Sequence, residues 1–575
     1  MNVLGIHDGH NAAAALVRDG RIVAAIQEER LSRIKNHDTF PARAVERVLQ
    51  MAGLAPRDLD AIALNGRHQP RHRTREQLMA AVREAGEESL GARLRQLARN
   101  SPINSLFRGL RKQEREEECA AAGLPRDRLT FVNHHEAHAA AACWGAPFRK
   151  SGEPLLVLTC DGAGDDLCAT VSLARDGRLE RLFEIAEEHS IGMVYLTVTQ
   201  ILGMVPNEHE YKLMGLAPYA KGEAVDRCLE VFNALMEFEP GGAPRWRRRA
   251  GVPHAFGMYR HLRDALEGCR FDAIAGAVQR WTEAMLCEWV RRAVAATGVS
   301  RVALSGGVFM NVKANKTILE LPEVTHLFVV PSCGDESNAF GAALAAWGAV
   351  HPKASEACSI PPLGPVYWGE AFDTDALQRA VAEAGTGLSI ETLDDPAERV
   401  ADLLARGEIV ARFDGPSEFG ARALGNRSIL ADPSRPELVR ELNEAIKNRD
   451  FWMPFAATVV CERAGDYVVN PKDVAAPYMI LAFDTTARRQ EIRAAIHPCD
   501  FTVRPQVLDK AANPAFHAVV RAFEARTGCG ALLNTSFNLH GHPMVYSPAD
   551  ALDVFRRSGL RRMALGRFLL SKPCA

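Results

Sequence analysis

Three histidines fall within five positions of the stretch VNHHEAHAAAACW, residues 132–144, and their spacing is typical of a metal site. His134 and His138 are four residues apart, so on a helix both imidazoles project from the same face. His135 lies off that face, and we expect it to support a ligand or to reach the surface. The alanines that follow let such a helix pack closely against a sheet. A capped helix with incidental histidines is the alternative interpretation.

A metal ion needs further ligands, and two aspartates at predicted strand ends are candidates. Asp161 stands in LTCDGAGDD and Asp335 in SCGDES. A single aspartate at such a corner often only caps the next helix. Combined with two imidazoles, however, the two carboxylates would form a set that suits Fe(II), Mn(II) or Zn(II), and the residues do not choose among these metals.

Two glycine corners are candidate phosphate sites, because backbone N–H groups can approach an anion where a glycine turn opens a helix. One corner comprises Ser305, Gly306 and Gly307, and the other contains Gly334. A Gly-Gly corner is more often only a tight turn. The motifs EYKLMGLAPYA and MNVKANK add polar groups suited to a nucleotide: Lys212, Asn311, Asn315 and Lys316.

A second set of candidates is mainly basic and lies after residue 415. Its members stand in GPSEFGARALGNRSIL, IKNRDFWMPF, TVRPQ and LLNTSFN: Arg422, Arg427, Lys447, Arg449, Arg504 and Asn534. Ordinary surface cations are the alternative, but the neighbouring Gly420, Gly425 and Pro454 argue against it. The pattern predicts a pocket for a small phosphorylated anion.

The elements that must position the metal ligands follow a repeated plan. Residues 1–26 and 155–184 each predict a strand, an Asp-Gly corner and a hairpin that turns at a second Asp-Gly pair. Asp8 and Asp161 occupy equivalent corners of the two copies. The repetition predicts a duplicated α/β half with a functional cleft between the copies.

The 575 residues are enough for two or three domains. Prolines and a loss of periodicity at 350–365 mark a boundary. We therefore predict an α/β N-terminal domain at 1–352, with a charged helical insertion at about 66–130. A linker at 353–365 and a second α/β domain at 366–575 follow.

The composition argues against several classes of protein. A formal net charge of −2 gives no sign of a nucleic-acid surface or a polybasic membrane anchor. No apolar run reaches the ~20 residues that span a bilayer, and MNVLGIHDGH lacks the features of a secretory signal. The 13 cysteines are scattered and include no CxxC pair, as expected of reduced thiols. We predict a cytoplasmic protein that binds neither nucleic acid nor membranes.

Eleven motifs, in family order and over nearly the whole chain, resemble those of the NodU/CmcH family of O-carbamoyltransferases. They are HNAAAALVRDGRI, EERLSR, HHEAHAA, DGAG, YKLMGLAPY, LSGGVFMN, GDESNAFGAA, FGARALGNRS, KNRDFWMPFA, VRPQ and LNTSFN. The resemblance implies a Kae1-like N-terminal domain of the ASKHA superfamily and a YrdC-like C-terminal domain. It also implies that carbamoyl phosphate and ATP give a carbamoyl-adenylate. The carbamoyl group then passes to a hydroxyl of a small molecule in antibiotic, sugar or toxin biosynthesis.

The resemblance also assigns roles to the candidate residues. His134, His138, Asp161 and Asp335 would hold a divalent metal, Fe2+ before Mn2+ or Zn2+, and Mg2+ would accompany ATP. The nucleotide would contact Lys212, Gly306, Gly307, Asn311, Asn315 and Gly334. Carbamoyl phosphate would bind Arg422, Arg427, Lys447, Arg449, Arg504 and Asn534, with Lys447 and Arg504 also catalytic. His10 would lie near the acceptor hydroxyl as a candidate general base.

One position departs from the family pattern. Some relatives carry an arginine where this chain has Met453, directly before Pro454. If that arginine contacts phosphate, Arg449 or Arg427 must compensate, or the pocket binds more weakly.

Other proteins combine similar domains. A tRNA-threonylcarbamoyl synthase fusion would need a more basic face than a net charge of −2 suggests. A hydrogenase-maturation carbamoyltransferase would add an acylphosphatase and cysteine-rich zinc fingers. A non-catalytic ASKHA nucleotide-binding protein would not explain why the His-x-x-x-His helix and the arginines coexist. We expect acceptor contacts in 66–130 and 236–272, because loops vary on a fixed scaffold, and we predict a homodimer as one assembly.

Overall fold

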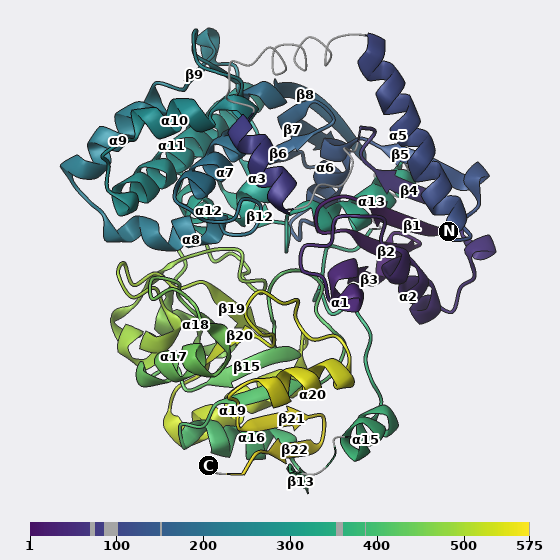
Figure 1. Cartoon of the computed structure of the whole chain (residues 1–575), viewed down its shortest axis with the longest axis vertical. Coiled ribbons are helices and arrows are strands. Elements are labelled where there is room, and N and C mark those ends of the chain that lie inside the picture. The colour runs from purple at the N-terminus through teal and green to yellow at the C-terminus, as the bar shows by residue number, and fades with distance from the viewer. Residues whose placement is uncertain are drawn as a thin grey trace. The chain divides into compact units, whose positions relative to one another are not determined.

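The computed structural model of this chain divides into two compact units (Figure 1). It describes residues 1–68, 75–84, 102–149, 152–351, 360–383, 385 and 387–573. Unit 1 comprises 1–28 and 36–363, and unit 2 comprises 29–35 and 364–575. The chain thus passes to unit 2 at Gly364, within the predicted linker, whose residues 353–359 lie outside the described ranges. The short excursion of 29–35 into unit 2 was not predicted.

Unit 1 contains two five-stranded sheets of identical plan. The first comprises β1 (Asn2–His7), β2 (Ala13–Arg18), β3 (Arg21–Gln27), β4 (Ala61–Asn65) and β5 (Leu129–Val132), in the order β3-β2-β1-β4-β5. The second comprises β6 (Leu155–Gly164), β7 (Leu167–Arg175), β8 (Arg178–Ala186), β11 (Arg301–Ser305) and β12 (His326–Val329), in the order β12-β11-β6-β7-β8. In each sheet the first three strands form an antiparallel meander, and the last two run parallel to the first. The predicted duplication of an α/β half is confirmed.

The hairpins of the two copies turn where the sequence predicted. Asp19 and Gly20 have φ of 49° and 76°, and Asp176 and Gly177 have φ of 50° and 72°. Positive φ at both central residues matches the right-handed twist of the flanking strands, which is why Asp-Gly suits these turns.

Small residues allow the helices of unit 1 to pack closely. α13 (Asn338–Val350) packs against β1 and against α6 (His134–Gly145). A Cβ atom on Gly341 would lie 2.2 Å from the carbonyl oxygen of Ala137, and one on Gly5 would lie 1.8 Å from that of Ala339. Only glycine fits at these crossings, so the alanine-rich helix is held firmly against the sheet.

The predicted insertion is helical in the part that the structure describes; residues 69–74 and 85–101 lie outside it. Its two helices are α3 (Arg75–Glu84) and α5 (Pro102–Ala121). In α3, Leu78 and Val82 pack in an apolar cluster with Met193 and Leu196 of α7 (Ile191–Ile201). The insertion leaves the first sheet and returns to it, and α3 contacts the helices of the second copy on the way.

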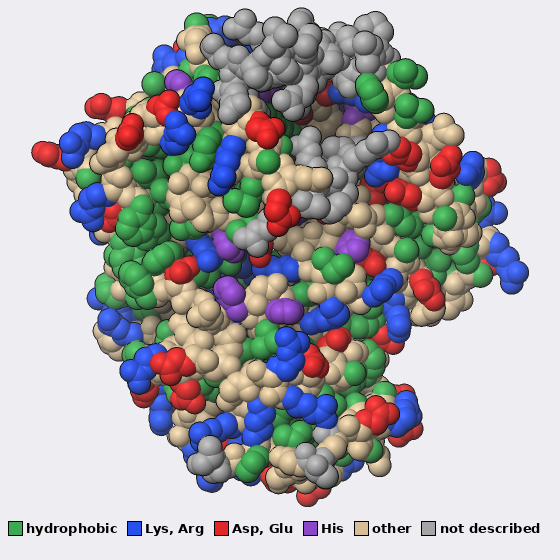
Figure 2. Space-filling view, in the orientation of Figure 1, with side chains coloured by type: hydrophobic (Ala, Val, Ile, Leu, Met, Phe, Trp, Pro, Cys, Tyr) green, Lys and Arg blue, Asp and Glu red, His purple; other side chains and the backbone are tan. Residues whose placement is uncertain are grey.

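The long helix α11 (Phe271–Thr297) organises the remaining helices of unit 1 (Figure 1). Four helices pack against it: α7, α8 (Glu210–Leu216), α9 (Glu223–Asn233) and α12 (Val312–Leu319). Basic and acidic side chains are interspersed over α9 and α10 (Tyr259–Ala265) on the face drawn in Figure 2. One ion pair joins Arg280 of α11 to Asp226 of α9 at 2.7 Å.

Unit 2 is built on an eight-stranded mixed sheet. Its strands are β13 (Ser389–Thr392), β14 (Val410–Phe413), β15 (Arg427–Ala431), β16 (Ala456–Val460), β19 (Pro505–Leu508), β20 (Ala531–Ser536), β21 (Arg562–Leu565) and β22 (Phe568–Ser571). Their order is β13-β22-β21-β14-β15-β20-β16-β19. α16 (Pro396–Ala405) packs against both β14 and α19 (Pro514–Thr527). The predicted second α/β domain is confirmed, and its YrdC-like character stays a prediction.

Among the helices of the described residues, none combines the length and the apolar character that crossing a bilayer requires.

Candidate functional site

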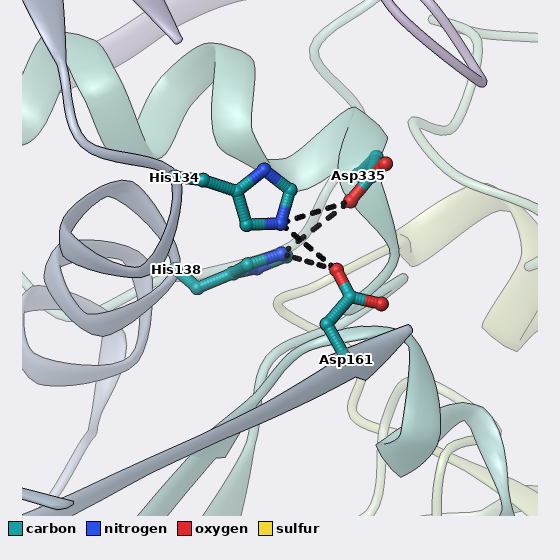
Figure 3. Close-up of side chains that lie close together, drawn as sticks. All are labelled: His134, His138, Asp161 and Asp335. Carbon is teal, nitrogen blue, oxygen red and sulfur yellow. Dashed lines mark hydrogen bonds and ion pairs between the residues drawn. The ribbon is translucent and has the colours of Figure 1, made fainter. Parts of the chain in front are cut away.

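The four predicted metal ligands of unit 1 converge on one point (Figure 3). His134 and His138 project from one face of α6, Asp161 lies on β6, and Asp335 follows β12. One donor atom from each residue lies within 4.8 Å of the others. The Nε2 atoms of His134 and His138 lie 3.0 and 3.2 Å from Asp161 Oδ2, and each lies 3.5 Å from Asp335 Oδ1.

Hydrogen bonds behind the ligands aim them at this point. Oδ1 of Asp161 accepts from the backbone N–H groups of Gly162 (2.7 Å) and Gly307 (3.2 Å), which leaves Oδ2 for the cluster. Nδ1 of His138 lies 3.1 Å from Ser305 Oγ, so Nε2 is the atom that faces the carboxylates. Such outer partners usually fix the orientation of metal-binding imidazoles.

The charges of this cluster suit a divalent cation. Burial, followed by the nearby Asp161, raises the pKa of Asp335 well above its usual range. Burial acts to raise the pKa of Asp161 too, but hydrogen bonds from His134 and His138 hold it well below its usual range. Oδ1 of Asp335 is buried and has no hydrogen-bond partner. A cation among these two nitrogen and two oxygen donors would satisfy that atom and offset the two carboxylates.

His7, at the end of β1, joins this cluster although the sequence did not single it out. Its Nε2 lies 3.0 Å from the carbonyl oxygen of His10 and 3.8 Å from Asp335 Oδ2. Its Nδ1 lies 3.0 Å from Asn65 Nδ2. These partners imply that Nε2 carries the proton, and burial lowers the pKa of His7 to about 3. A neutral His7 thus connects the backbone of His10 with Asp335, while the predicted catalytic role of the His10 side chain stays a prediction.

Two neighbouring side chains prove to be structural supports. His135 is fully buried, with Nδ1 2.8 Å from Thr159 Oγ1 and Nε2 3.1 Å from Leu167 O, so it does not reach the surface. Asp8, the counterpart of Asp161, pairs instead with Arg115 of α5 at 2.7 and 2.8 Å, and both side chains are fully buried. The duplicated aspartate therefore ties the insertion to the first sheet.

The glycines predicted to bind phosphate contact the segments that carry the predicted metal ligands Asp161 and Asp335. Gly306 donates its N–H to Cys333 O (3.0 Å), and Gly307 donates to Asp161. Gly306 has a φ of 109°, and a Cβ there would lie 2.2 Å from Cys160 O. A Cβ on Gly334 would lie 2.6 Å from Glu336 Oε2. The amides of Gly306 and Gly307 thus have partners within the protein, and the nucleotide role of Gly306, Gly307 and Gly334 stays a prediction.

The other predicted nucleotide residues separate into two groups. Asn311 caps α12 and exchanges two hydrogen bonds with Gln279 of α11, at 2.9 and 3.0 Å. Gln279 also accepts from the Tyr195 hydroxyl (2.9 Å), which makes a polar cluster where α7, α11 and α12 meet. Asn315, by contrast, is fully buried and donates to Phe309 O (2.7 Å), and its nucleotide role stays a prediction.

The two lysines of this group lie on the helices that pack against α11. Lys316 of α12 forms an ion pair with Glu320 at 2.7 Å. Lys212 lies on α8 and is partly exposed. The nucleotide roles of Lys316 and Lys212 stay predictions.

In unit 2, three of the predicted cations lie close to one another. The pKa of Arg504 is held well below its usual range by burial first, and then by the positive charges of Arg422 and Arg449. Arg449 donates to Thr535 Oγ1 at 3.1 Å. The buried Met453 belongs to the same segment as Arg449. We call Arg422, Arg449 and Arg504 the arginine trio.

Arg427 serves a different purpose from the arginine trio. It is fully buried, and its guanidinium donates to four backbone carbonyls: those of Asp414, Gly415, Asn426 and Glu370, at 3.0 to 3.3 Å. It also stacks 3.7 Å from the centroid of the Phe413 ring. Burial lowers its pKa to about 10. Both terminal nitrogens thus donate to the backbone, and the predicted contact of Arg427 with an anion stays a prediction.

Lys447 and Asn534 are also held by the protein. Nζ of Lys447 donates to the carbonyl oxygen of Ser536 and to Asn538 Oδ1 (2.8 Å), and burial holds its pKa well below the usual range. Asn534 is 1% exposed and donates to Ala423 O (3.2 Å) and Thr458 Oγ1 (3.0 Å). Asn534 contacts the residue that follows Arg422, and Lys447 is two residues before Arg449. The predicted contact of both residues with a ligand stays a prediction.

Three residues that the sequence did not point out hold the loop that carries Arg422 through hydrogen bonds. Oε1 of the buried Glu418 accepts from the N–H groups of Leu424, Asn426 and Arg427, at 2.7 to 3.2 Å. The Tyr367 hydroxyl (2.7 Å) and Gln506 Nε2 (2.9 Å) both donate to Leu424 O. The only available signal was a glutamate directly before FGARALGN, a motif otherwise read for its arginines.

Comparisons with known proteins agree in both halves of the chain. A family described as Carbamoyltransferase N-terminus matches residues 2–344, and one described as Carbamoyltransferase C-terminus matches residues 401–572. Nodulation protein NolNO of Sinorhizobium fredii is 32% identical over 98% of this chain and 79% of its own length. Nodulation protein NolO of Bradyrhizobium diazoefficiens is 33% identical over 77% of this chain and 79% of its own length.

Among solved structures, full-length HypF in its phosphate- and nucleotide-bound form is 13% identical, and the match covers 61% of this chain and 55% of that one. Its TM-score is 0.31, a similarity too low to carry an argument. The family assignment therefore depends on the sequence matches, which together span both units, and these show that the chain belongs to the carbamoyltransferase family and is a carbamoyltransferase.

Proposed function

We propose that this enzyme uses carbamoyl phosphate and ATP to carbamoylate a hydroxyl group of a small-molecule natural product. The observation that carries the proposal is the arginine trio. Three guanidinium groups close together repel one another, and this repulsion contributes to the lowered pKa of the partly buried Arg504. A bound anion with several acceptor oxygens would relieve the repulsion, and arginine forks bind phosphate oxygens in pairs. Carbamoyl phosphate has that chemistry, and the carbamoyltransferase family supports it as the donor.

The reaction proceeds in two parts. In the first, carbamoyl phosphate, ATP and one water give carbamoyl-adenylate, phosphate and pyrophosphate. In the second, the acceptor oxygen forms a bond to the carbamoyl carbon, the bond from that carbon to the AMP oxygen breaks, and the hydroxyl proton leaves. In the first part the trio stabilises negative charge on the departing phosphate, which is the usual catalytic use of fixed cations.

His10 is the proposed base for the second part. A neutral imidazole within hydrogen-bond reach of a hydroxyl can accept its proton, which contributes on the order of 10²–10⁴ in rate. The backbone of His10 is held by His7, whose low pKa keeps it neutral. His7 can therefore orient the turn that carries His10 without competing for the proton.

The cluster of His134, His138, Asp161 and Asp335 is the proposed site of a divalent cation, with Fe2+, Mn2+ and Zn2+ as candidates. When bound, such an ion can orient nucleotide phosphates or polarise a carbonyl group. For the nucleotide we propose the cluster of Asn311 and Gln279, because two amides bonded to each other can exchange those bonds for a ribose or a base.

The remaining part of the proposal is the acceptor, the molecule whose hydroxyl receives the carbamoyl group. Two relatives are named as nodulation proteins. We propose a sugar hydroxyl or a comparable hydroxyl of a natural product, with acceptor contacts in the insertion.

The first half-reaction can be tested without an acceptor. The purified protein is incubated with ATP, carbamoyl phosphate and a divalent metal while phosphate and pyrophosphate release are followed. A carbamoyl group linked to AMP is sought by mass spectrometry. We expect the adduct in the wild-type protein and its loss in Arg504→Ala.

Arg440→Ala is the matched control, because this arginine belongs to the same unit but is 86% exposed, and its one ion pair among the described residues is with Glu444, at 3.6 Å. It should form the adduct at the wild-type rate. Nucleotide binding without any turnover that depends on carbamoyl phosphate would contradict the proposed donor.

A further inference from the structure

The turn between β6 and β7 has an unusual sequence for its geometry. Its central residues, Asp165 and Asp166, have φ of 50° and 69°. Turns of this kind favour glycine at the second position. The two hairpins described above, which turn at Asp19-Gly20 and Asp176-Gly177, have glycine there. A non-glycine residue is strained at such φ, and the strain must be offset by contacts with the surrounding structure. Both aspartates make specific contacts.

Asp165 holds the helix that carries the histidine ligands. Its Oδ2 accepts from the backbone N–H of His134 at 2.7 Å. That N–H belongs to the first turn of α6, where no partner exists within the helix. A carboxylate at this end also interacts favourably with the helix dipole.

The same hairpin therefore places two ligands of the proposed metal. Asp161 is part of β6, and the tip of β6 fixes the backbone of His134 through Asp165. Between them, Gly164 leaves room for the ring of His134, because a Cβ there would lie 2.2 Å from Cγ and Cδ2 of that ring. The imidazole thus lies directly against the strand.

The turn also contacts the insertion at two places. The carboxylate of Asp165 accepts from the N–H groups of Arg67 (3.0 Å) and His68 (2.7 Å), where the chain leaves β4. Asp166 forms a two-pronged ion pair with Arg108 of α5, at 2.5 and 3.0 Å. A single carboxylate, that of Asp165, is thus bonded both to a metal-ligand backbone and to the root of the insertion.

We propose that Asp165 is a positioning residue of the metal site, which fixes His134 for the cation and links the root of the insertion to it. This inference rests on the proposed metal site, and it assigns the turn a role beyond that site's four ligands. Because residues 67–68 and His134 share one carboxylate, a displacement of the insertion root changes the backbone that carries the ligand.

The test uses Co2+ as a probe, because its visible absorption reports the geometry of its ligands. Co2+ is titrated into the metal-free full-length protein and into Asp165→Ala, Asp165→Asn and Asp166→Ala. Loss of an outer partner typically costs about 10–100-fold in metal affinity. We expect a loss of that size and an altered spectrum in Asp165→Ala. A smaller loss is expected in Asp165→Asn, whose single amide oxygen keeps only part of the set of bonds.

Asp166→Ala is the matched control. It removes a carboxylate from the same turn but only an exposed ion pair, with Asp166 53% exposed, so Co2+ affinity and spectrum should stay unchanged. In the metal-free proteins, hydrogen exchange at the amides of His134, Arg67 and His68 should be faster in Asp165→Ala than in Asp166→Ala.

The outcomes separate the two proposals. Wild-type affinity and spectrum in Asp165→Ala would overturn the positioning role while leaving the metal site intact. No Co2+ binding by the wild-type protein would overturn the metal site, and with it the role of Asp165. If Asp165→Ala does not fold, Asp165→Asn decides, because a wild-type spectrum and affinity in that variant also count against the proposal.

Discussion

Two arginines of unit 2, the buried Arg427 and the partly buried Arg504, should respond to the same substitution with opposite effects on stability. Arg427→Met removes a guanidinium that donates to four backbone carbonyls, and Arg504→Met removes one whose positive charge is disfavoured by burial and by two other arginines. Methionine keeps the length and apolar stem of the side chain, so the comparison isolates the charged group.

For Arg427→Met the expected change is a large loss of stability. Each buried carbonyl left without a partner costs about 1–3 kcal/mol, although some of the four will find new partners on relaxation. Removing one partner of a buried charged network typically costs about 3–5 kcal/mol. We therefore expect the free energy of unfolding to fall by about 3–5 kcal/mol.

For Arg504→Met the sign reverses. Burial lowers the pKa of both arginines in the folded state, so each positive charge opposes folding at neutral pH. Four carbonyl acceptors offset this cost at Arg427, whereas two further positive charges add to it at Arg504. Without ligand, the variant should be as stable as the wild-type protein or more stable. It should, however, lose the stabilisation by carbamoyl phosphate, which at a hundred times Kd is about 2.7 kcal/mol.

The assay is urea unfolding of the full-length proteins, followed by fluorescence and circular dichroism, with and without carbamoyl phosphate. Arg440→Met serves as the exposed control and should match the wild-type protein in both conditions. A stable Arg427→Met that no longer responds to carbamoyl phosphate would show that Arg427 is the ligand-binding residue. An unstable Arg504→Met would refute the argument from charge repulsion.

Three further predictions follow from single contacts. His138→Ala should lower bound metal at least about tenfold by elemental analysis, and unchanged metal content together with unchanged turnover would refute the metal site. Gly425 has a φ of 116°, and a Cβ there would lie 2.1 Å from Phe516, so Gly425→Ala should distort the loop that carries Arg422 and raise KM for carbamoyl phosphate. Gly465→Ala is the control, because a Cβ there meets nothing within 4 Å, and its KM should not change. Equal KM values for the two variants would contradict this. Burial raises the pKa of Glu210 to about 7, so it contributes stability that is present below its ordinary pKa of 4.5 and is lost as the pH rises to about 7. Glu210→Gln should remove this decline, which is at most about 3 kcal/mol, and parallel stability curves for the two proteins would show that the carboxyl is not shifted.

Much of the fold, and the candidate metal site of unit 1, could be predicted from local sequence patterns. The spacing of His134 and His138, and the Asp-Gly corners of the two copies, depend on residues close in the chain, where helix and turn geometry fix side-chain direction. The same reasoning found the hairpins of the two copies.

The roles of the cations could not be predicted in this way. Arg422 and Arg427 are five residues apart in one motif, yet one belongs to the trio and the other is enclosed by carbonyls. Whether an arginine meets carbonyls or other cations depends on strands and loops that are distant in sequence, such as Glu370 for Arg427 and Arg504 for Arg422.

The sequence by itself determined the duplicated α/β plan, the two-unit organisation in outline and the identity of the four side chains that converge near α6. The tertiary structure alone decided that Asp8 pairs with Arg115 whereas Asp161 faces two histidines, although the two aspartates occupy equivalent corners. It also decided that His7 and Asp165 belong to the surroundings of the metal site. The physical reason is that secondary structure follows from contacts within a few residues, whereas the partners of a buried charge or hydrogen-bonding group are set by whichever distant segments the packed core brings to it.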